Sequence, residues 1–520
     1  MKSVDTGRII DCCYIALPEL GMLSAGCLFF LLGTFLGGRR FWAGATTLVL
    51  GLALLFLVVE NRTLPETQGN WLLHGGAWIF RFLGPIIGLA GVAMLAPRCK
   101  ASAGHGPEDF ACLLIACSGV GLAGMAPDLI LLFLSMELVS IPVYFLLYLA
   151  RHDRAGQEST IKYFLLSVLS SGFFLFGASY LYGVTGSMRL DGLGGIHENL
   201  RWPEAGSNPL PGSRVIALLF LLAGVGFKIT AAPFHFYAPD VYQGTSPAMA
   251  GLLSTLPKAA GFAVLLRLIG LGDSPLSVFG GSELSLLWIL AVATMTVGNL
   301  LALWQSHLHR LLAYSGVAHG GYMLAALATG NLEGVSAMAF YLGAYCLMTL
   351  GAFAVLSYLD DPACPVTRID DLAGLSRNHP IAAICLGICI MGMIGLPLTA
   401  GFIGKLRILK TSLGASASQA NSLFLVLAFF IVINAAISAW YYLGVLNRVF
   451  LRLPLGPQPR PSTSWPLVAA VACAMVTVVA GVLPGLFDRY TDAVEHSQAR
   501  DNFGKLESRL ADSGNPQKKP

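Results

Sequence analysis

The sequence has few charged residues for its length. Of its 520 residues, only 12% are Asp, Glu, Lys or Arg, while 55% are hydrophobic, and the mean hydropathy is +0.70. Soluble domains usually carry about 25% charged residues, so the composition excludes a soluble protein and predicts one that crosses a membrane many times. The formal net charge of +4 is small and indicates no nucleic-acid partner.

The cysteines form no metal-binding or redox pattern. The chain has eleven of them. Cys385 and Cys389 share a helix face at i, i+4, but their neighbours are all apolar, which favours ordinary helix packing over metal ligation. Cys12 and Cys13 are adjacent and say nothing about a disulfide. The cysteines therefore predict no metal site.

Long apolar runs dominate the chain instead. A hydrocarbon core of about 30 Å requires about 20 apolar residues per helix, and fourteen such stretches occur between Leu17 and Phe487. Barrel strands would alternate polar and apolar residues, so these unbroken runs predict an all-α polytopic membrane protein. The expected spans are residues 15–37, 41–59, 78–97, 109–126, 128–150, 158–184, 213–230, 247–270, 284–304, 308–329, 335–359, 380–410, 421–447 and 465–487.

Basic residues in the connections predict an orientation. With both termini outside, the inward loops hold more Lys and Arg than the outward loops, as the positive-inside rule requires. The first run is too long for a signal peptide and predicts a retained helix. Residues 187–213 are expected to form a loop, and the tail after Asp488 a short helix followed by disorder. The inward basic residues would be Arg39, Arg40, Arg98, Lys100, Arg151, Arg154, Arg310, Arg368, Arg377, Arg448, Arg452 and Arg460.

Two spans contain interruptions. One is interrupted at Pro233 and Pro239, and the other at Pro397, with Lys228 and Lys405 near the respective breaks. Paired interrupted helices indicate an internal repeat and a transport site near the middle of the membrane. A dinucleotide-like GVGLAG, residues 119–124, lies inside an apolar run rather than between a strand and a helix, so it predicts helix packing and no nucleotide site.

Several charged residues lie deep in the predicted spans. At about 1.5 Å per residue, Glu137 lies about 14 Å, Lys258 about 17 Å and Lys228 about 22 Å into their helices. Each costs about 2.5–3.5 kcal/mol to insert. Static neutralising pairs are one explanation, but the excess of lysines leaves Lys258 and Lys405 without an evident partner. Since burial favours the neutral form of lysine, proton exchange is the other explanation, and we prefer it.

Three further residues are candidate proton relays. His319 lies well inside an apolar span, and His235 lies in the first interrupted segment, where a broken helix can admit water. Lys162 stands near the start of its helix, so a snorkelling role is nearly as plausible as a relay role.

The sequence resembles the antiporter-like membrane subunits of proton-pumping NADH-quinone oxidoreductase, respiratory complex I, and most of all subunit N, called subunit 2 in mitochondria. The resemblance covers nearly the whole chain. It is carried by MELVSIPVYFLLYL around Glu137, IKYFLLSVLSSGFFLFGASYLYGVTGS from Ile161, GFKITAAPFHFYAPDVYQG, LPKAAGF around Lys258, HRLLAYSGVAHGGY, and GLPLTAGFIGK ending at Lys405.

The resemblance implies fourteen helices, with three in residues 1–108, two inverted five-helix repeats in 109–270 and 284–452, a last helix in 465–487 and a polar tail in 488–520. It implies no redox cofactor in this chain, with FMN, iron–sulfur clusters and quinone in partner subunits of a bacterial inner-membrane complex.

The resemblance also implies roles for single residues. Glu137 and Lys228 would form an acid–lysine pair, Lys258 would be the central lysine, and Lys405 would lie toward the exit. Lys162, His235 and His319 match further positions of the polar axis.

The chain departs from the family pattern at two places. His309 stands where a basic residue usually precedes the arginine, and TSPA has one proline, Pro247, where a two-proline turn is usual.

Two rival classes stay open. One is a component of a multisubunit cation/proton antiporter or of a related membrane-bound hydrogenase, and the other is a purely structural membrane subunit. Lys405, where related subunits can carry glutamate, and the lack of a long C-terminal lateral helix favour subunit N over subunits M and L.

Overall fold

The computed structural model describes most of the apolar part of the chain. The predicted tail, 488–520, and most of the predicted 187–213 loop lie outside the described residues. The residues described are 13–33, 35, 38–63, 77–96, 106–151, 153–190, 195–196, 211–269, 281–361, 365–419, 422–454, 461 and 463–485.

Most of the described residues are helical, and the only β-structure among them is a pair of isolated bridges. Every one of the fourteen predicted spans contains a helix, so the all-α polytopic fold is confirmed. Eleven of the described helices are long and apolar enough to cross a membrane, and α2, α9 and α16 provide shorter apolar segments. The helices are α2 (Leu17–Leu32), α3 (Arg39–Thr63), α4 (Ala77–Leu95), α5 (Pro107–Met125), α6 (Leu129–Ala150), α7 (Arg154–Thr185), α9 (Pro211–Lys228), α10 (Ala238–Gly244), α11 (Pro247–Ile269), α12 (Gly281–Leu303), α13 (Leu308–Ala328), α14 (Leu332–Tyr358), η2 (Ile369–Leu372), α15 (Leu375–Asn378), α16 (Pro380–Ile394), α17 (Ala400–Gln419), α18 (Ser422–Leu451) and α19 (Trp465–Val482).

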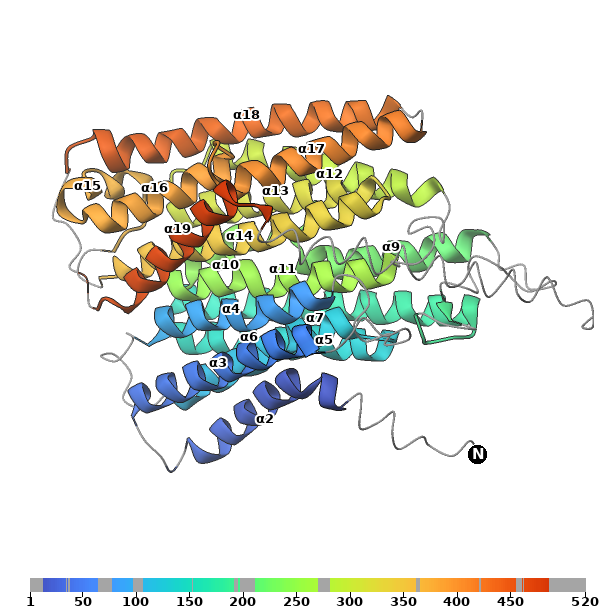
Figure 1. The fold of residues 1–520 in the computed structure, drawn as a ribbon, viewed down its shortest axis with the longest axis horizontal. Coiled ribbons are helices and arrows are strands. Elements are labelled where there is room, and N and C mark those ends of the chain that lie inside the picture. Colours follow the sequence, from blue (N-terminus) through green and yellow to red (C-terminus); the bar gives the residue numbers. More distant parts are fainter. Residues whose placement is uncertain are drawn as a thin grey trace, which may run out of the picture.

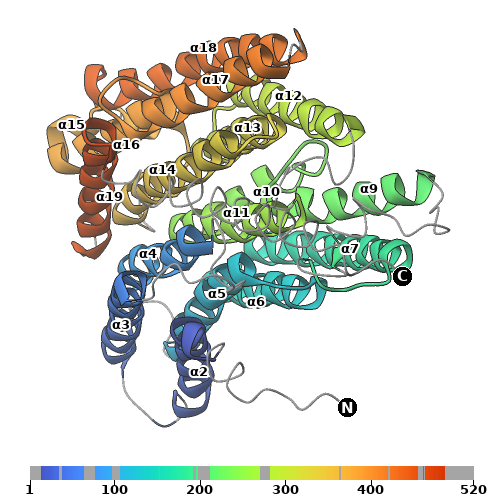
Figure 2. The ribbon, with the colours of Figure 1, turned by 45° about the vertical axis from the view of Figure 1, so that its right-hand side comes forward.

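Most of the long helices lie side by side in roughly one direction, and α19 crosses them obliquely (Figure 1). Helices α2 and α3 form one margin and α18 the opposite one, with α11, α13 and α14 between them in both views (Figures 1 and 2). Every residue of α11 is buried, whereas α18 exposes large apolar side chains such as Phe429 and Trp440. Because exposed apolar side chains of this kind suit lipid rather than water, the central helices form the protein core and the outer ones face the bilayer.

One end of the bundle carries a group of arginines at or near helix ends. It holds the starts of α3, α7 and α13 and the end of α18, and it is the end at which α15 lies in Figure 1. Asp153 caps α7 there by accepting a hydrogen bond from the backbone N–H of Gly156, which lowers the pKa of Asp153. We call this end, defined by Arg39, Arg151, Arg154, Arg310 and Arg448, the basic end, and its inward orientation stays a prediction.

Two spans are broken helices, as predicted. Residues 229–237 separate α9 from α10, and residues 395–399 separate α16 from α17. Each break holds a non-glycine residue in the left-handed region, Thr230 at φ 57° and Leu398 at φ 72°. Because α16 begins at the basic end and α9 at the opposite end, the two broken helices run in opposite directions (Figure 1).

The role predicted for one proline was wrong. Pro233 and Pro397 lie inside the breaks, but Pro239 is the second residue of α10. A proline in the first turn removes no helical hydrogen bond, because the N–H groups there have no partner within the helix. Pro239 therefore starts the second half-helix and does not interrupt it.

The GVGLAG segment lies within α5 and serves packing, as predicted. A side chain at Gly119 would lie 2.8 Å from Val139 of α6, and one at Gly124 would lie 2.9 Å from Phe80 of α4. These glycines allow three helices to approach closely.

An ion cluster that the sequence analysis did not identify connects α2, α3 and α4. Arg81 donates to Glu19 at 2.7 Å and to Glu60 at 3.0 Å, and all three side chains are almost fully buried. Arg81 also donates to the carbonyl oxygen of Ile15 at 2.5 Å. Removing one member of a buried ion pair typically costs about 3–5 kcal/mol, so this cluster fixes how the first helices pack.

Candidate functional site

Lys228 lies at the end of α9 and reaches toward α6 and α7. Its side chain is buried, and Nζ donates to the hydroxyls of Ser140 at 2.7 Å and Ser167 at 2.6 Å. Tyr144 donates to the same Ser167 oxygen at 2.6 Å. The ammonium group is thus held by hydroxyl groups of two neighbouring helices.

Glu137 of α6 lies near this cluster without contacting the lysine directly. Its Oε1 accepts a hydrogen bond from Ser171 at 2.5 Å. Ser171 lies one turn after Ser167 on α7 and donates to the Ser167 carbonyl oxygen at 3.1 Å. Among the described residues, no ion pair within 4.0 Å joins Glu137 to Lys228. Ser167 and Ser171 of α7 therefore lie between the two members of the predicted acid–lysine pair.

Glu137 also faces a groove between three helices. This groove has a volume of about 290 Å³ and an otherwise apolar lining. Glu137, which is half-buried, contributes the aliphatic part of its side chain to this lining. The lining residues are Phe30, Cys112, Ile115, Leu134, Glu137, Leu138, Ile141, Pro142 and Phe145.

Lys258 occupies the centre of the bundle. Its Nζ donates to the carbonyl oxygen of Gly316 at 2.5 Å and to the Tyr345 hydroxyl at 3.0 Å. No carboxylate of the described chain lies within ion-pair distance of it. Gly261, less than a turn beyond Lys258, packs against the stem of Lys228, since a side chain at Gly261 would lie 3.2 Å from Lys228 Cβ. Lys228 and Lys258 therefore lie on helices that pack together, while their Nζ atoms contact different neighbouring helices.

His319 continues the polar row beyond Lys258. Its ring nitrogens lie 2.7 Å from the hydroxyl of Tyr341 and 3.1 Å from that of Tyr442. Its ring centroid is 5.3 Å from that of Tyr345, which contacts Lys258. An imidazole between hydroxyl groups can donate through one nitrogen and accept through the other, which suits a proton relay.

Lys405 lies beside the second broken helix. Its Nζ donates to the carbonyl oxygens of Met393 at 2.8 Å and Ile394 at 2.9 Å, at the end of α16. It lies 5.1 Å from the ring centroid of Tyr322, whose ring is 6.1 Å from that of His319. A cation at the C-terminal end of a helix is stabilised by the unpaired carbonyls and the helix dipole, so Lys405 both caps α16 and ends the polar row.

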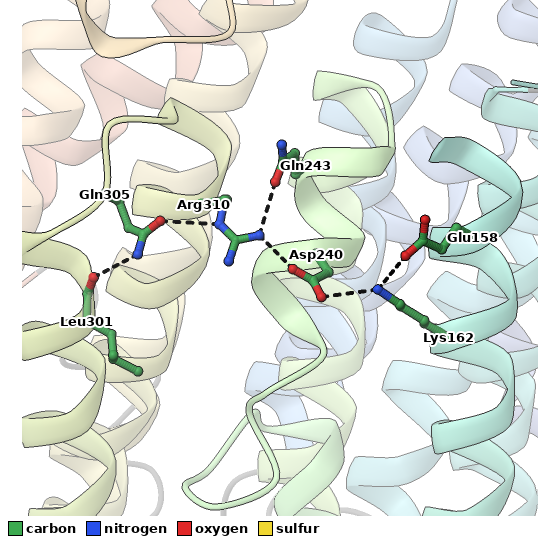
Figure 3. A network of polar contacts seen from close by, with 7 residues as sticks. All are labelled: Glu158, Lys162, Asp240, Gln243, Leu301, Gln305 and Arg310. Atoms are coloured by element: carbon green, nitrogen blue, oxygen red, sulfur yellow. Dashed lines mark hydrogen bonds and ion pairs between the residues drawn. The ribbon is translucent and has the colours of Figure 1, made fainter. Parts of the chain in front are cut away.

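Lys162 lies away from this row, in a half-exposed network at the basic end. It pairs with Glu158 at 2.6 Å and Asp240 at 3.2 Å. Asp240 in turn pairs with Arg310 at 2.6 Å, and Arg310 also contacts Gln243 (Figure 3). This network joins α7, α10 and α13.

His235 lies in the first break, as predicted. It is half-buried, and its ring centroid is 6.4 Å from that of Tyr314. Within the described part of the chain, Nδ1 has no hydrogen-bond partner, so this nitrogen is free to bind water.

The structure thus brings Lys228, Lys258, His319 and Lys405 into one buried row. It attaches Glu137 to this row through serines and places Lys162 at the basic end. The sequence analysis did not identify the side chains that contact the buried lysines, His319 and Lys162. A hydroxyl or charged group inside an apolar helix could have indicated them. The missed residues are Ser140, Tyr144, Ser167, Ser171, Asp240, Arg310, Tyr322, Tyr341, Tyr345 and Tyr442.

Comparison with known proteins shows which family the chain belongs to. Residues 126–432 match the family model described as NADH:quinone oxidoreductase/Mrp antiporter, transmembrane. NADH-quinone oxidoreductase subunit N 1 of Solibacter usitatus is 34% identical over 427 residues, 81% of this chain and 84% of that protein. This chain belongs to the subunit N family. Subunit N of Trichlorobacter lovleyi is 34% identical over 480 residues, covering 91% of this chain and 94% of the relative.

Solved structures share the fold of this chain. A chain of respiratory complex I from Thermus thermophilus with bound aureothin has a TM-score of 0.75 and 34% identity, covering 90% of this chain and 98% of that one. A chain of the Mrp complex from Dietzia has a TM-score of 0.78 but 19% identity, so that likeness shows the fold alone. It covers 92% of this chain and 96% of the Dietzia chain.

Proposed function

We propose that this subunit N protein moves protons across the membrane as part of an NADH-quinone oxidoreductase complex. The observation that carries the proposal is the row of buried lysines held by hydroxyl and carbonyl groups. A lysine paired permanently with a carboxylate would stay charged, whereas Lys258 and Lys405 have no such partner in the described structure. Such a lysine can gain and lose a proton at modest cost.

In this mechanism the row works by proton transfer between neighbouring groups. The charge of Glu137 acts on Lys228 across Ser171 and Ser167, because Ser171 holds the carboxylate and the Ser167 hydroxyl one turn earlier holds the lysine. Lys258 passes its proton toward His319 by way of Tyr345, whose hydroxyl contacts the lysine.

The two ends of the row have separate roles in the mechanism. Lys405 receives the proton near the second break, and Tyr322 lies between it and His319. His235 and Lys162 lie outside the row and serve the approach from the basic end.

The energy for this transfer comes from partner subunits. Electron transfer from NADH to quinone would use FMN and iron–sulfur clusters held by those subunits, with no redox cofactor in this chain. The basic end faces inward by the positive-inside rule, which places both termini on the periplasmic side of a bacterial inner membrane.

Replacing the central lysine tests the proposal. Lys258→Ala should abolish proton pumping by membrane vesicles oxidising NADH while the complex still assembles. Lys410→Ala, at an exposed lysine of α17, is the matched control and should pump normally. Normal pumping by the Lys258 variant would show that the buried row has only a structural role.

Co-purification separates the proposal from the cation/proton antiporter alternative. A complex I subunit should purify with flavin and iron–sulfur proteins, whereas an antiporter component should not. The Dietzia likeness shows a shared fold and does not favour the antiporter.

A further inference from the structure

His309 is a buried histidine that the row described above does not use. It is the second residue of α13, and 5% of its surface is exposed. Neither ring nitrogen has a hydrogen-bond partner in the described structure. The half-buried His307 lies beside it, with ring centroids 5.6 Å apart. Buried polar groups in proteins are nearly always satisfied by protein or by bound water, so the His309 ring is a site for water.

His309 lies on the same face of α13 as the carbonyl that holds Lys258. Gly316 follows His309 by seven residues, which is about two turns and about 10 Å along the helix. Its carbonyl oxygen accepts a hydrogen bond from Lys258 Nζ. His309 therefore lies between the basic end and the central lysine.

A second unpartnered group lies along the same line on α14. Tyr345, Thr349 and Phe353 are spaced by four residues and share a helix face. Tyr345 contacts Lys258, and the Phe353 ring centroid is 6.1 Å from that of His309, so Thr349 lies between these two contacts. The Thr349 hydroxyl is buried, and it lies close to Tyr345 one turn earlier without a hydrogen bond of normal geometry among the described residues.

Helix α11 packs beside the His309–Thr349 region of α13 and α14. Gly251 packs against Phe353, since a side chain at Gly251 would lie 2.9 Å from Phe353 Cβ. Lys258 follows Gly251 by seven residues on α11. The line from His309 to Lys258 is thus enclosed by α11, α13 and α14, and its unpartnered polar atoms are those of His309 and Thr349.

We propose that His309 and Thr349 form a water-mediated entry path that delivers protons from the basic end to Lys258. The path rests on the proposed function of the subunit. A proton enters at His307, crosses to one ring nitrogen of His309, and leaves from the other nitrogen to water. The Thr349 hydroxyl orders that water and passes the proton toward Tyr345 and neutral Lys258. Each step moves one proton between oxygen and nitrogen atoms and requires no other reactant.

Paired variants at Thr349 test the path in the intact complex in inverted membrane vesicles. Thr349→Val keeps the shape but removes the hydroxyl, and Thr349→Ser keeps the hydroxyl. We expect the valine variant to pump about fivefold to tenfold more slowly, the factor that corresponds to losing one hydrogen bond, and the serine variant to pump normally. Thr477→Val is the control, because that buried hydroxyl donates to the Cys473 carbonyl oxygen within α19, a helix that does not line the path.

His309→Gln removes the titratable ring but keeps polar atoms in its place. Its pumping rate should fall at least as far as that of Thr349→Val, and the ratio of rates in H₂O and D₂O should rise, because proton delivery becomes limiting. A structural defect alone would leave that ratio unchanged. His379→Gln, at the start of α16, is the matched control and should leave both quantities unchanged.

The outcomes separate the path from the function. Normal pumping by both Thr349→Val and His309→Gln, with Lys258→Ala inactive, overturns the entry path and leaves the proposed function in place. Normal pumping by Lys258→Ala overturns the proposed function itself. If the valine variant fails to assemble, Thr349→Ala removes the hydroxyl with a smaller side chain and decides the question in its place.

Discussion

Asp240 and Arg310 form a 2.6 Å ion pair that joins the first broken helix to α13. The second carboxylate oxygen of Asp240 accepts from Lys162 on α7 at 3.2 Å (Figure 3). One carboxylate therefore connects three helices that are distant in the sequence. It does so at the basic end, a few residues from the start of the proposed entry path at His307.

Asp240→Asn should slow proton pumping while the complex still assembles. The Asp240 side chain is 43% exposed, and exposed ion pairs contribute only about 0.2–1 kcal/mol each. Asp240 makes two such pairs, so the expected loss in rate is at most about thirtyfold, measured as the initial rate of acidification in inverted vesicles. Asp153→Asn, which removes an exposed pair with Arg151 at the same end, should pump normally. An equal loss in both variants would show a general charge effect at this end.

Lys405 allows a test that separates capping from proton exchange. Lys405→Ala should lower pumping by about tenfold or more, because a positioned proton-transfer group typically contributes about 10²–10⁴-fold. Lys405→Arg keeps a cation near the carbonyls of Met393 and Ile394, but arginine does not release its proton. The arginine variant should assemble normally and still pump poorly. Parental pumping by that variant would assign Lys405 to helix capping alone.

Glu137→Gln should depress coupled NADH oxidation and pumping together. The amide keeps the shape and can still accept from Ser171, but it removes the negative charge that favours a protonated Lys228. Glu137→Asp should retain part of both activities. Rates are measured in sealed vesicles after assembly has been confirmed by native electrophoresis. Full activity of the glutamine variant would show that charge at this position is not required.

Gly401→Ala should destabilise the second broken helix. A methyl group at Gly401 would lie 1.9 Å from the carbonyl oxygen of Gly392, so α16 and α17 would have to separate. Overpacking of this kind typically costs about 1–3 kcal/mol or more. The melting temperature and yield of the complex should both fall. Gly414→Ala on the same helix has no atom within 4 Å of the new methyl group and should leave stability unchanged or slightly raised.

The sequence alone determined the class of fold. Apolar runs of about 20 residues can satisfy their backbone groups in lipid only as helices, so each predicted span proved helical. It also identified Lys228, Lys258 and Lys405. A charged side chain in the middle of an apolar run is costly to insert into the membrane, and this cost can be recognised without knowing which residues surround it. Local chemistry was sufficient for these conclusions.

Tertiary structure alone decided which groups meet. Ser167 and Ser171, which lie between Glu137 and Lys228, both belong to α7. The hydroxyl beside Lys258 comes from Tyr345, 87 residues away. Helix periodicity shows which residues share a face, but it does not show which faces of two distant helices pack together. The contacts of Lys162 and of His309 likewise depend on how α7, α10, α13 and α14 meet at the basic end. That packing is set by the whole set of helices at once, and no single segment encodes it.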